Sequence, residues 1–259
     1  MTSAHSLGAA VLLGASLLAP WAAQAQQTIE SLGLTVTTTP LVATDYLFRG
    51  ISQTRDRPAI QGTLDVEHES GIYVGAFLSN AMFAGTNIRQ ELDGFLGYRF
   101  QALGAKFDLG AVYFAYPGYD EPPGGFSPNW WELQAKVSYE IAPFKLLGTF
   151  AWSPDYNFES GNGFYLEGGV DVALPYAFTL SGRLGYQWID RNFASVNRPN
   201  DGYWGAPDYM VGSVAVSREI VWGFIGTVGF SFTNLSQTEC FGGQKICDNR
   251  VYATISRPF

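Results

Sequence analysis

Residues 164–188 read FYLEGGVDVALPYAFTLSGRLGYQW, and this stretch decides the fold. From Phe164 to Leu174 every second residue is apolar or glycine, and the same period of two returns from Phe178 to Trp188. Such alternation is typical of β-strands, in which successive side chains point to opposite faces. A turn at residues 175–177 separates the two runs, so the stretch predicts a β-hairpin.

The same period recurs along the chain and predicts about twelve strands. Aromatic residues stand at one or both ends of the apolar faces, as they do in strands that face lipid. Short turns alternate with longer connections, which is typical of outer-membrane barrels. A soluble sandwich or lipocalin-like barrel is the alternative, but it would not require this alternation. The sequence therefore predicts an all-β fold, a transmembrane antiparallel β-barrel, with strands at 32–48, 59–68, 72–79, 88–100, 105–116, 130–139, 144–153, 163–174, 178–188, 209–218, 222–233 and 250–259.

The composition excludes two other classes of protein. The chain has 259 residues, of which 47% are hydrophobic and only 15% are charged. A spanning helix needs about 20 consecutive apolar residues, and the only stretch that approaches this length, residues 7–19, is too short. The net charge of -8 and the absence of a basic run argue against nucleic-acid binding.

The first 25 residues have the form of a signal peptide. An apolar core at residues 11–18 precedes Ala23-Gln24-Ala25, the small-x-small pattern that signal peptidase accepts. We expect cleavage after Ala25, which leaves residues 26–259 as the barrel domain. No Lys or Arg precedes the core, and a buried N-terminal helix is the alternative.

The two cysteines, Cys240 and Cys247, fit an exported chain. They lie in a segment rich in turn residues, and a disulfide between them persists in an oxidising compartment. A metal site is the weaker alternative, because zinc normally requires a second pair of thiols or nearby histidines. We therefore expect a disulfide and no metal.

If the apolar faces meet lipid, the charged side chains of the strands line the lumen. Buried charges must pair with one another or be hydrated by a channel. The mild acidic excess predicts a weak preference for cations. The expected pore-lining residues are the acids Asp65, Glu67, Glu91, Asp93, Asp108, Glu132, Glu167 and Asp171 and the bases Arg99, Lys106, Lys136, Lys145, Arg183 and Arg218.

Nothing in the sequence predicts an enzyme. No GxSxG, HExxH or P-loop pattern occurs. His68 is the one histidine that remains after cleavage, and its position beside a short turn favours a solvated turn residue over a catalytic one. We expect no catalytic residues and no cofactor.

Four segments carry a family resemblance: 44–54 (TDYLFRGISQT), 58–62 (PAIQG), 71–75 (GIYVG) and 91–98 (ELDGFLGY). These segments resemble the TorF family of proteobacterial porins, and the likeness extends over essentially the mature chain. The resemblance implies an outer-membrane barrel that acts as a porin and supplies no catalytic or substrate residues. Within the first segment, Asp45 and Arg49 stand four apart on the expected first strand, so they share a face. They form an inward ion pair near the extracellular rim, or else Arg49 ends the strand and Asp45 is one more acid of the lumen.

These observations predict a passive channel for small hydrophilic solutes in the bacterial outer membrane. Its expected partners are outer-membrane lipid, the solutes and, during insertion, the barrel-assembly machinery; the oligomeric state stays open. The alternative is a non-conducting structural or adhesion barrel, whose lumen is closed by paired charges and whose long loops, notably 116–129 and 189–208, bind an external partner.

Overall fold

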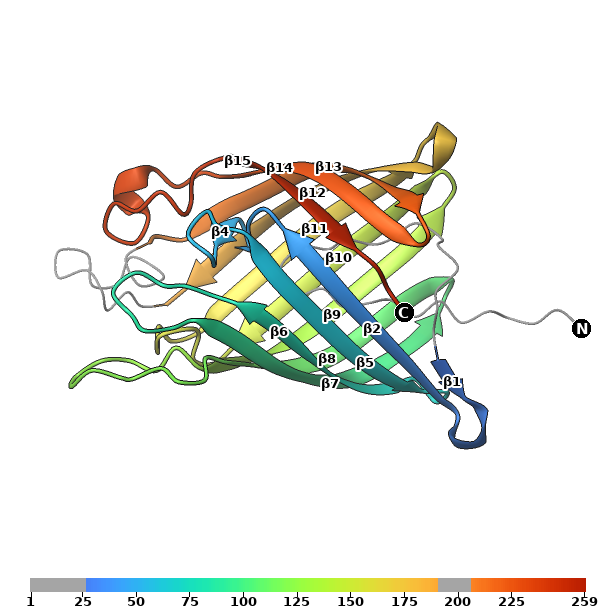
Figure 1. The fold of residues 1–259 in the computed structure, drawn as a ribbon, viewed down its shortest axis with the longest axis horizontal. Helices are drawn as coiled ribbons and strands as arrows, with labels where there is room; N and C mark the ends of the chain where they lie inside the picture. The colour runs from blue at the N-terminus through green and yellow to red at the C-terminus, as the bar shows by residue number, and fades with distance from the viewer. Residues whose placement is uncertain (1–26, 191–205) are drawn as a thin grey trace, which may run out of the picture.

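The computed structural model describes residues 27–190 and 206–259. It is a closed antiparallel barrel whose long strands tilt across the axis (Figure 1). The expected signal peptide at 1–25, its cleavage site after Ala25 and most of the 189–208 loop lie outside the described residues. Among the residues described, no helix is long and apolar enough to cross a membrane.

Twelve strands form the wall, which confirms the predicted fold class. The other elements of the described residues are short: the strands β1 (Gln27–Ile29), which precedes the wall, β3 (Leu47–Phe48) and β4 (Ile51–Ser52), and three-residue helical turns. The strands of the wall are β2 (Leu34–Ala43), β5 (Ala59–His68), β6 (Ile72–Asn80), β7 (Gln90–Ala102), β8 (Ala105–Ala115), β9 (Trp130–Ile141), β10 (Phe144–Ser153), β11 (Gly163–Ala173), β12 (Phe178–Ile189), β13 (Tyr209–Val221), β14 (Phe224–Thr233) and β15 (Arg250–Ser256).

Each strand of the wall pairs antiparallel with the next in the chain, and β2 closes the ring by pairing with both β5 and β15. The edge of β2 that meets β15 is shared among three segments. β15 pairs with residues 41–43, the backbone of Phe259 exchanges two hydrogen bonds with Thr38, and β1 pairs with residues 34–36. The two ends of the described chain therefore complete the barrel seam together.

The alternating side chains of each strand face the outside and the inside of the wall in turn. On β7, Leu92, Leu96 and Tyr98 are exposed on the outer surface, whereas Glu91 and Phe95 are buried inside. Outward apolar side chains in a closed ring suit lipid as the surrounding medium, and closure leaves no unpaired strand edge.

The two ends of the barrel differ. One end carries the short turns that join β5 to β6, β7 to β8, β9 to β10, β11 to β12 and β13 to β14, and the other carries the long loops (Figure 1). The first expected strand, 32–48, ends at Ala43 instead, because the chain then turns into the barrel. The segments predicted to begin at residue 222 and to end at 259 shorten to 224 and 256.

A tyrosine packed over two glycines fixes the local packing of β6, β7 and β8. Gly97 and Gly110 are register partners, and Tyr73 is the partner of Gly97 on its other side. A Cβ atom at either glycine would lie 2.6 Å from the Tyr73 hydroxyl oxygen, so only glycine leaves room for the ring. That hydroxyl donates to Asp108 at 2.6 Å.

We expect Gly97→Val to destabilise the barrel by about 1–3 kcal/mol, because overpacking forces the ring and the neighbouring backbone apart. Gly94→Val is the matched control on the same strand, since a Cβ atom there would have no atom within 4 Å. Urea unfolding in detergent micelles, followed by tryptophan fluorescence, measures both variants. Equal midpoints for the two variants would contradict the prediction.

Candidate functional site

After β2 the chain leaves the wall and folds into the lumen as a small hairpin, residues 45–54, which we call the inserted hairpin. Its strands β3 and β4 pair through Leu47 with Ser52 and Phe48 with Ile51. The two residues between them, Arg49 and Gly50, have φ values of 48° and 80°. Positive φ at both positions is typical of a type I′ turn, which matches the twist of paired strands.

Gly50 is required for a second reason besides its backbone angle. A Cβ atom at this position would lie 2.7 Å from a methyl carbon of Val211 and 2.8 Å from one of Thr233. The tip of the inserted hairpin therefore packs directly against the inner side of β13 and β14. No other residue fits this turn without moving the wall.

The inserted hairpin crosses the lumen and contacts the wall on several sides. The Tyr46 hydroxyl donates to Glu91 on β7 at 2.8 Å, and Leu47 packs against Ala215 on β13 and Tyr252 on β15. The Phe48 ring lies 5.7 Å from that of Phe114 on β8 and 6.1 Å from that of Trp130 on β9. At this level the side chains of the inserted hairpin occupy part of the lumen and, with the wall, bound the space that is left.

Arg49 anchors the tip of the inserted hairpin to the far wall. Its guanidinium donates to both carboxylate oxygens of Glu132 at 2.8 and 2.9 Å and to Gln187 at 2.8 Å. It also lies 4.3 Å from the centroid of the Tyr165 ring. Burial is the largest single influence and lowers the pKa of Arg49, but the Glu132 carboxylate together with Tyr156 and Tyr165 outweighs it and raises the pKa. The result is a buried ion pair in which one guanidinium nitrogen contacts both carboxylate oxygens.

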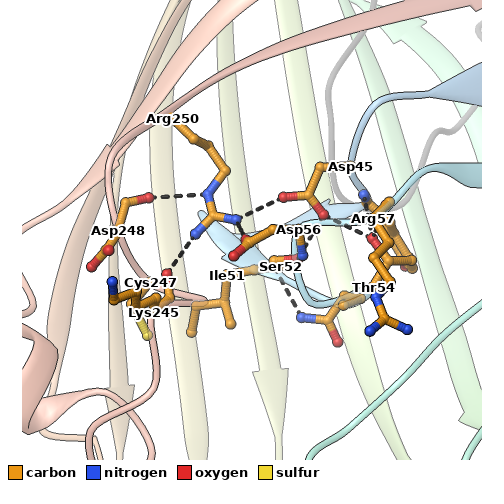
Figure 2. Close-up of polar contacts among 12 residues, drawn as sticks. Asp45, Ile51, Ser52, Thr54, Asp56, Arg57, Lys245, Cys247, Asp248 and Arg250 are labelled. Atoms are coloured by element: carbon orange, nitrogen blue, oxygen red, sulfur yellow. Dashed lines mark hydrogen bonds and ion pairs between the residues drawn. The ribbon is translucent and has the colours of Figure 1, made fainter.

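Asp45 anchors the base of the inserted hairpin. One of its carboxylate oxygens accepts from the hydroxyls of Ser52 at 2.6 Å and Thr54 at 2.8 Å, and the other accepts from Arg250 at 2.8 Å (Figure 2). Asp45 thus pairs with Arg250, whereas Arg49 pairs with Glu132. The predicted ion pair between Asp45 and Arg49 is wrong, because Asp45 lies at the base of the inserted hairpin and Arg49 in its turn, so they do not share a strand.

The register places all but one of the expected pore-lining residues on the inner face of the wall. The exception is Arg218, which is exposed on the outer face beside Val214 and Val216 and lies 5.0 Å from the Phe178 ring centroid. It shares the parity of those valines, so its assignment to the lumen is corrected. The inward residues are Asp65, Glu67, Glu91, Asp93, Arg99, Lys106, Asp108, Glu132, Lys136, Lys145, Glu167, Asp171 and Arg183.

Many of these charges pair within the lumen. Arg99 donates to Asp65 at 2.8 Å and to Glu67 at 2.6 Å, and it reaches Asp108 at 3.4 Å. One guanidinium thus faces three carboxylates, which leaves this part of the wall with an excess of negative charge.

Two further ion pairs lie on the inner wall, one on the later strands and one beside the Arg99 cluster. Arg183 donates to Asp171 at 2.6 Å, and Lys106 meets Glu140 at 3.1 Å in a more exposed position. Glu167 accepts from the Tyr165 hydroxyl at 2.7 Å. The inner wall is therefore charged on several strands rather than on one side alone.

A cavity of about 140 Å³, lined by charged, polar and apolar side chains, adjoins the inserted hairpin inside the barrel. Arg49 and Gly50 form part of its lining, together with the charged side chains of Lys136, Glu167 and Arg183 from the wall. Hydroxyl groups of the wall, such as those of Ser213 and Thr254, and apolar side chains, such as those of Phe48 and Val211, also line it. The lumen therefore contains space next to the hairpin, with charged and polar groups at its boundary, where a small hydrophilic solute or water fits.

Within residues 27–190 and 206–259, no cluster of three or more His, Cys, Asp or Glu side chains could hold a metal ion. His68 and Ser70 meet at 2.9 Å on an exposed short turn, where the Ser70 amide donates to the same ring nitrogen. These hydrogen bonds close the turn. His68 thus lies at the end of the barrel that carries the short turns, away from the inserted hairpin, which lies in the half that carries the long loops.

The sequence contained one signal for the inserted hairpin that the strand assignment overlooked. Arg49-Gly50 stands between Leu47-Phe48 and Ile51-Ser52, and a two-residue turn with glycine between short β-type runs is a hairpin signal. The expected strand 32–48 instead joins the first strand of the hairpin, Leu47–Phe48, to the wall strand β2 and so hides the inward bend between them. The predicted disulfide between Cys240 and Cys247 is present, with the Cα atoms 6.0 Å apart.

The barrel, its polar lumen and its inserted hairpin define a protein with the fold of outer-membrane porins. The chain belongs to the Gcw_chp family, described as bacterial proteins of unknown function, whose model matches residues 27–259. No curated protein matches the sequence.

Solved porin structures share this fold. The KdgM porin has a TM-score of 0.54 and 10% identity, with 86% of this chain and 99% of that chain covered. The NanC porin has a TM-score of 0.53 and 9% identity, with 85% and 97% covered. KdgM in complex with disordered oligogalacturonate gives 0.51 and 9%, with 86% and 98% covered. At these identities the likeness establishes the fold.

Proposed function

We propose that this protein is a porin-like channel for passive diffusion of small hydrophilic solutes across the bacterial outer membrane. The observation that carries the proposal is the charged inner wall with its cavity beside the inserted hairpin. Apolar side chains such as Phe77 and Trp130 fill part of the interior, but charges in a dry interior are costly, so the charged part of the lumen favours a hydrated passage. The resemblance to TorF-type porins agrees with this assignment.

The proposed channel prefers cations weakly. Arg99 faces the three carboxylates of Asp65, Glu67 and Asp108, so this part of the inner wall attracts cations. Lys136 and Lys145 face the lumen on neighbouring strands and oppose the attraction. Because the two contributions partly cancel, we expect a preference and not strict selection.

The outer surface of the barrel supports a location in the outer membrane. Exposed apolar side chains encircle the wall, as they do in barrels that face lipid. The proposed partner during insertion is the barrel-assembly machinery. Export would be directed by residues 1–25 and followed by their removal through cleavage after Ala25, which N-terminal sequencing of the cell-derived protein tests. We assign the protein no enzymatic step.

A second candidate is favoured by the way the inserted hairpin crosses the lumen. If its side chains and the paired charges close the passage, the protein is a structural or adhesion barrel whose long loops bind an external partner. The lumenal ion pairs of Arg99 and Arg183 suit either candidate. Conduction separates the two.

We expect small, discrete single-channel steps from the refolded, signal-free protein in a planar bilayer, because the inserted hairpin restricts a lumen that is still polar. In a potassium chloride gradient, the reversal potential should shift towards the potassium equilibrium potential. A heat-modifiable, protease-resistant barrel that never conducts would contradict the channel and support the second candidate. Steps without any cation preference would remove the proposed selectivity only.

A further inference from the structure

The loop between β14 and β15, residues 234–249, is closed on itself by the Cys240–Cys247 disulfide and lies against the inserted hairpin. Both cysteines are fully buried, although the loop is at the end of the barrel. They belong to one apolar cluster with Ile51 of the inserted hairpin and Val211 of the wall. The disulfide therefore packs against the hairpin instead of facing solvent.

A backbone contact joins the loop to the inserted hairpin. The Ser52 amide donates to the Ile246 carbonyl at 2.9 Å. The neighbouring carbonyl, that of Cys247, accepts from the Thr233 hydroxyl at 2.9 Å. The loop thus bridges the end of β14 and the second strand of the hairpin.

Arg250, the first residue of β15, ties the same two segments together by charge. Its guanidinium donates to the carbonyls of Lys245 at 2.9 Å and Asp248 at 3.0 Å, both in the disulfide loop (Figure 2). It also pairs with Asp45 at 2.8 Å and with Asp56, on the two sides of the hairpin (Figure 2). One side chain thus holds the loop, the wall and the hairpin.

The inserted hairpin needs such a support. Its strands β3 and β4 form a two-stranded sheet of their own, separate from that of the wall. An isolated two-stranded hairpin is marginally stable in water. Its position therefore depends on side-chain anchors and on the loop that covers it.

We propose that the inserted hairpin is a movable gate and that the disulfide-closed loop, acting with Arg250, is the clamp that holds it in the lumen. The role of the hairpin as a gate rests on the proposed channel function. The role of the loop and Arg250 as a clamp concerns only the position of the hairpin and does not require conduction. Opening the loop by removing the disulfide frees the carbonyls of residues 245–248 from their fixed positions. The hairpin then spends more time out of its place in the lumen.

Hydrogen exchange measured by mass spectrometry tests the clamp directly in two variants, Arg250→Met and the double variant Cys240→Ser/Cys247→Ser. The first removes the charge anchor and keeps the disulfide, and the second does the reverse. In each variant we expect the amides of residues 46–54 to exchange at least about tenfold faster, because local opening becomes more frequent. The amides of β7–β10 keep their protection.

Arg218→Met is the matched control, since it removes an arginine from the outer surface away from the hairpin. Its exchange at residues 46–54 should equal that of the unmodified protein. Heat-modifiable migration establishes that each variant folds, and either clamp variant alone decides the outcome if the other fails to fold. Unchanged exchange at residues 46–54 in a folded clamp variant would overturn the proposal.

Conductance of the same variants separates this inference from the proposed function. The clamp variants should show higher mean conductance than the Arg218→Met protein. Faster exchange at the hairpin in variants that never conduct would uphold the clamp but overturn the channel and, with it, the gate. A conducting protein whose exchange and conductance are the same in all variants would uphold the channel and overturn the clamp.

Discussion

Replacing residues 45–56 by a short Gly-Ser linker should raise the single-channel conductance severalfold. The replaced segment contains the inserted hairpin, whose side chains reach β7, β8, β9, β12, β13 and β15. Without it the lumen at this level is bounded by the wall alone. The wall keeps its strands, because β2 and β5 pair with each other over residues 34–43 and 59–68 independently of the hairpin.

The removal of the hairpin also changes the state of the charges it covered. Glu132 is 1% exposed and pairs with Arg49, so loss of the hairpin leaves this carboxylate facing a wider passage. Water that enters the passage hydrates the carboxylate, which limits the loss of stability. The cation preference should therefore increase together with the conductance.

A shortened outer loop provides the control for this experiment. Residues 121–124 are exposed at the tip of the loop between β8 and β9, so their removal should leave conductance and reversal potential unchanged. Planar bilayer recordings of both variants measure the effect. If the linker variant conducts like the unmodified protein, the hairpin is not the narrowest part of the pathway.

The wall could be predicted from the sequence because its determinants are local. Alternation with a period of two assigns each side chain to one face, and the turns set the ends of the strands. The same parity would have placed Arg218 outside, since it follows Val214 and Val216 in steps of two. It was assigned by its charge, and an arginine beside Phe178 at the end of a strand is stable on the outer surface.

The site could not be predicted in the same way because its partners are distant in the chain. Arg49 and Glu132 are 83 residues apart, and Asp45 and Arg250 are 205 apart. Closure of the barrel alone brings these residues together. Residues 44–54, which carry part of the family resemblance, contain the inserted hairpin. The sequence does not reveal the partners of its side chains, because these partners lie on the opposite wall.

Breaking the pair at the tip of the hairpin should cost more stability than breaking any exposed pair in the lumen. We expect Arg49→Met to lower the free energy of unfolding by about 3–5 kcal/mol, because it leaves the Glu132 carboxylate buried without its cation. Gln134 still donates to that carboxylate at 2.6 Å but supplies no charge. Equilibrium unfolding in guanidinium, followed by tryptophan fluorescence in lipid vesicles, measures the loss.

Two further variants identify the cause of the loss. Arg49→Met/Glu132→Gln removes both charges and keeps an acceptor for Gln134, so it should recover more than half of the lost stability. Lys106→Met breaks a pair whose side chains are 35% and 43% exposed, and it should cost less than about 1 kcal/mol, as exposed ion pairs do. Equal losses for Lys106→Met and Arg49→Met would contradict a buried anchor at Arg49.

The stability loss and the position of the hairpin are linked. If the hairpin leaves the lumen in Arg49→Met, water hydrates Glu132. The loss of stability is then no larger than the free energy needed to displace the hairpin. A loss well below about 3 kcal/mol should then be accompanied by higher conductance and faster exchange at residues 46–54. A loss near the upper value with unchanged conductance would instead mean that the hairpin stays in place. A small loss with neither change would show that Arg49 does not hold the hairpin.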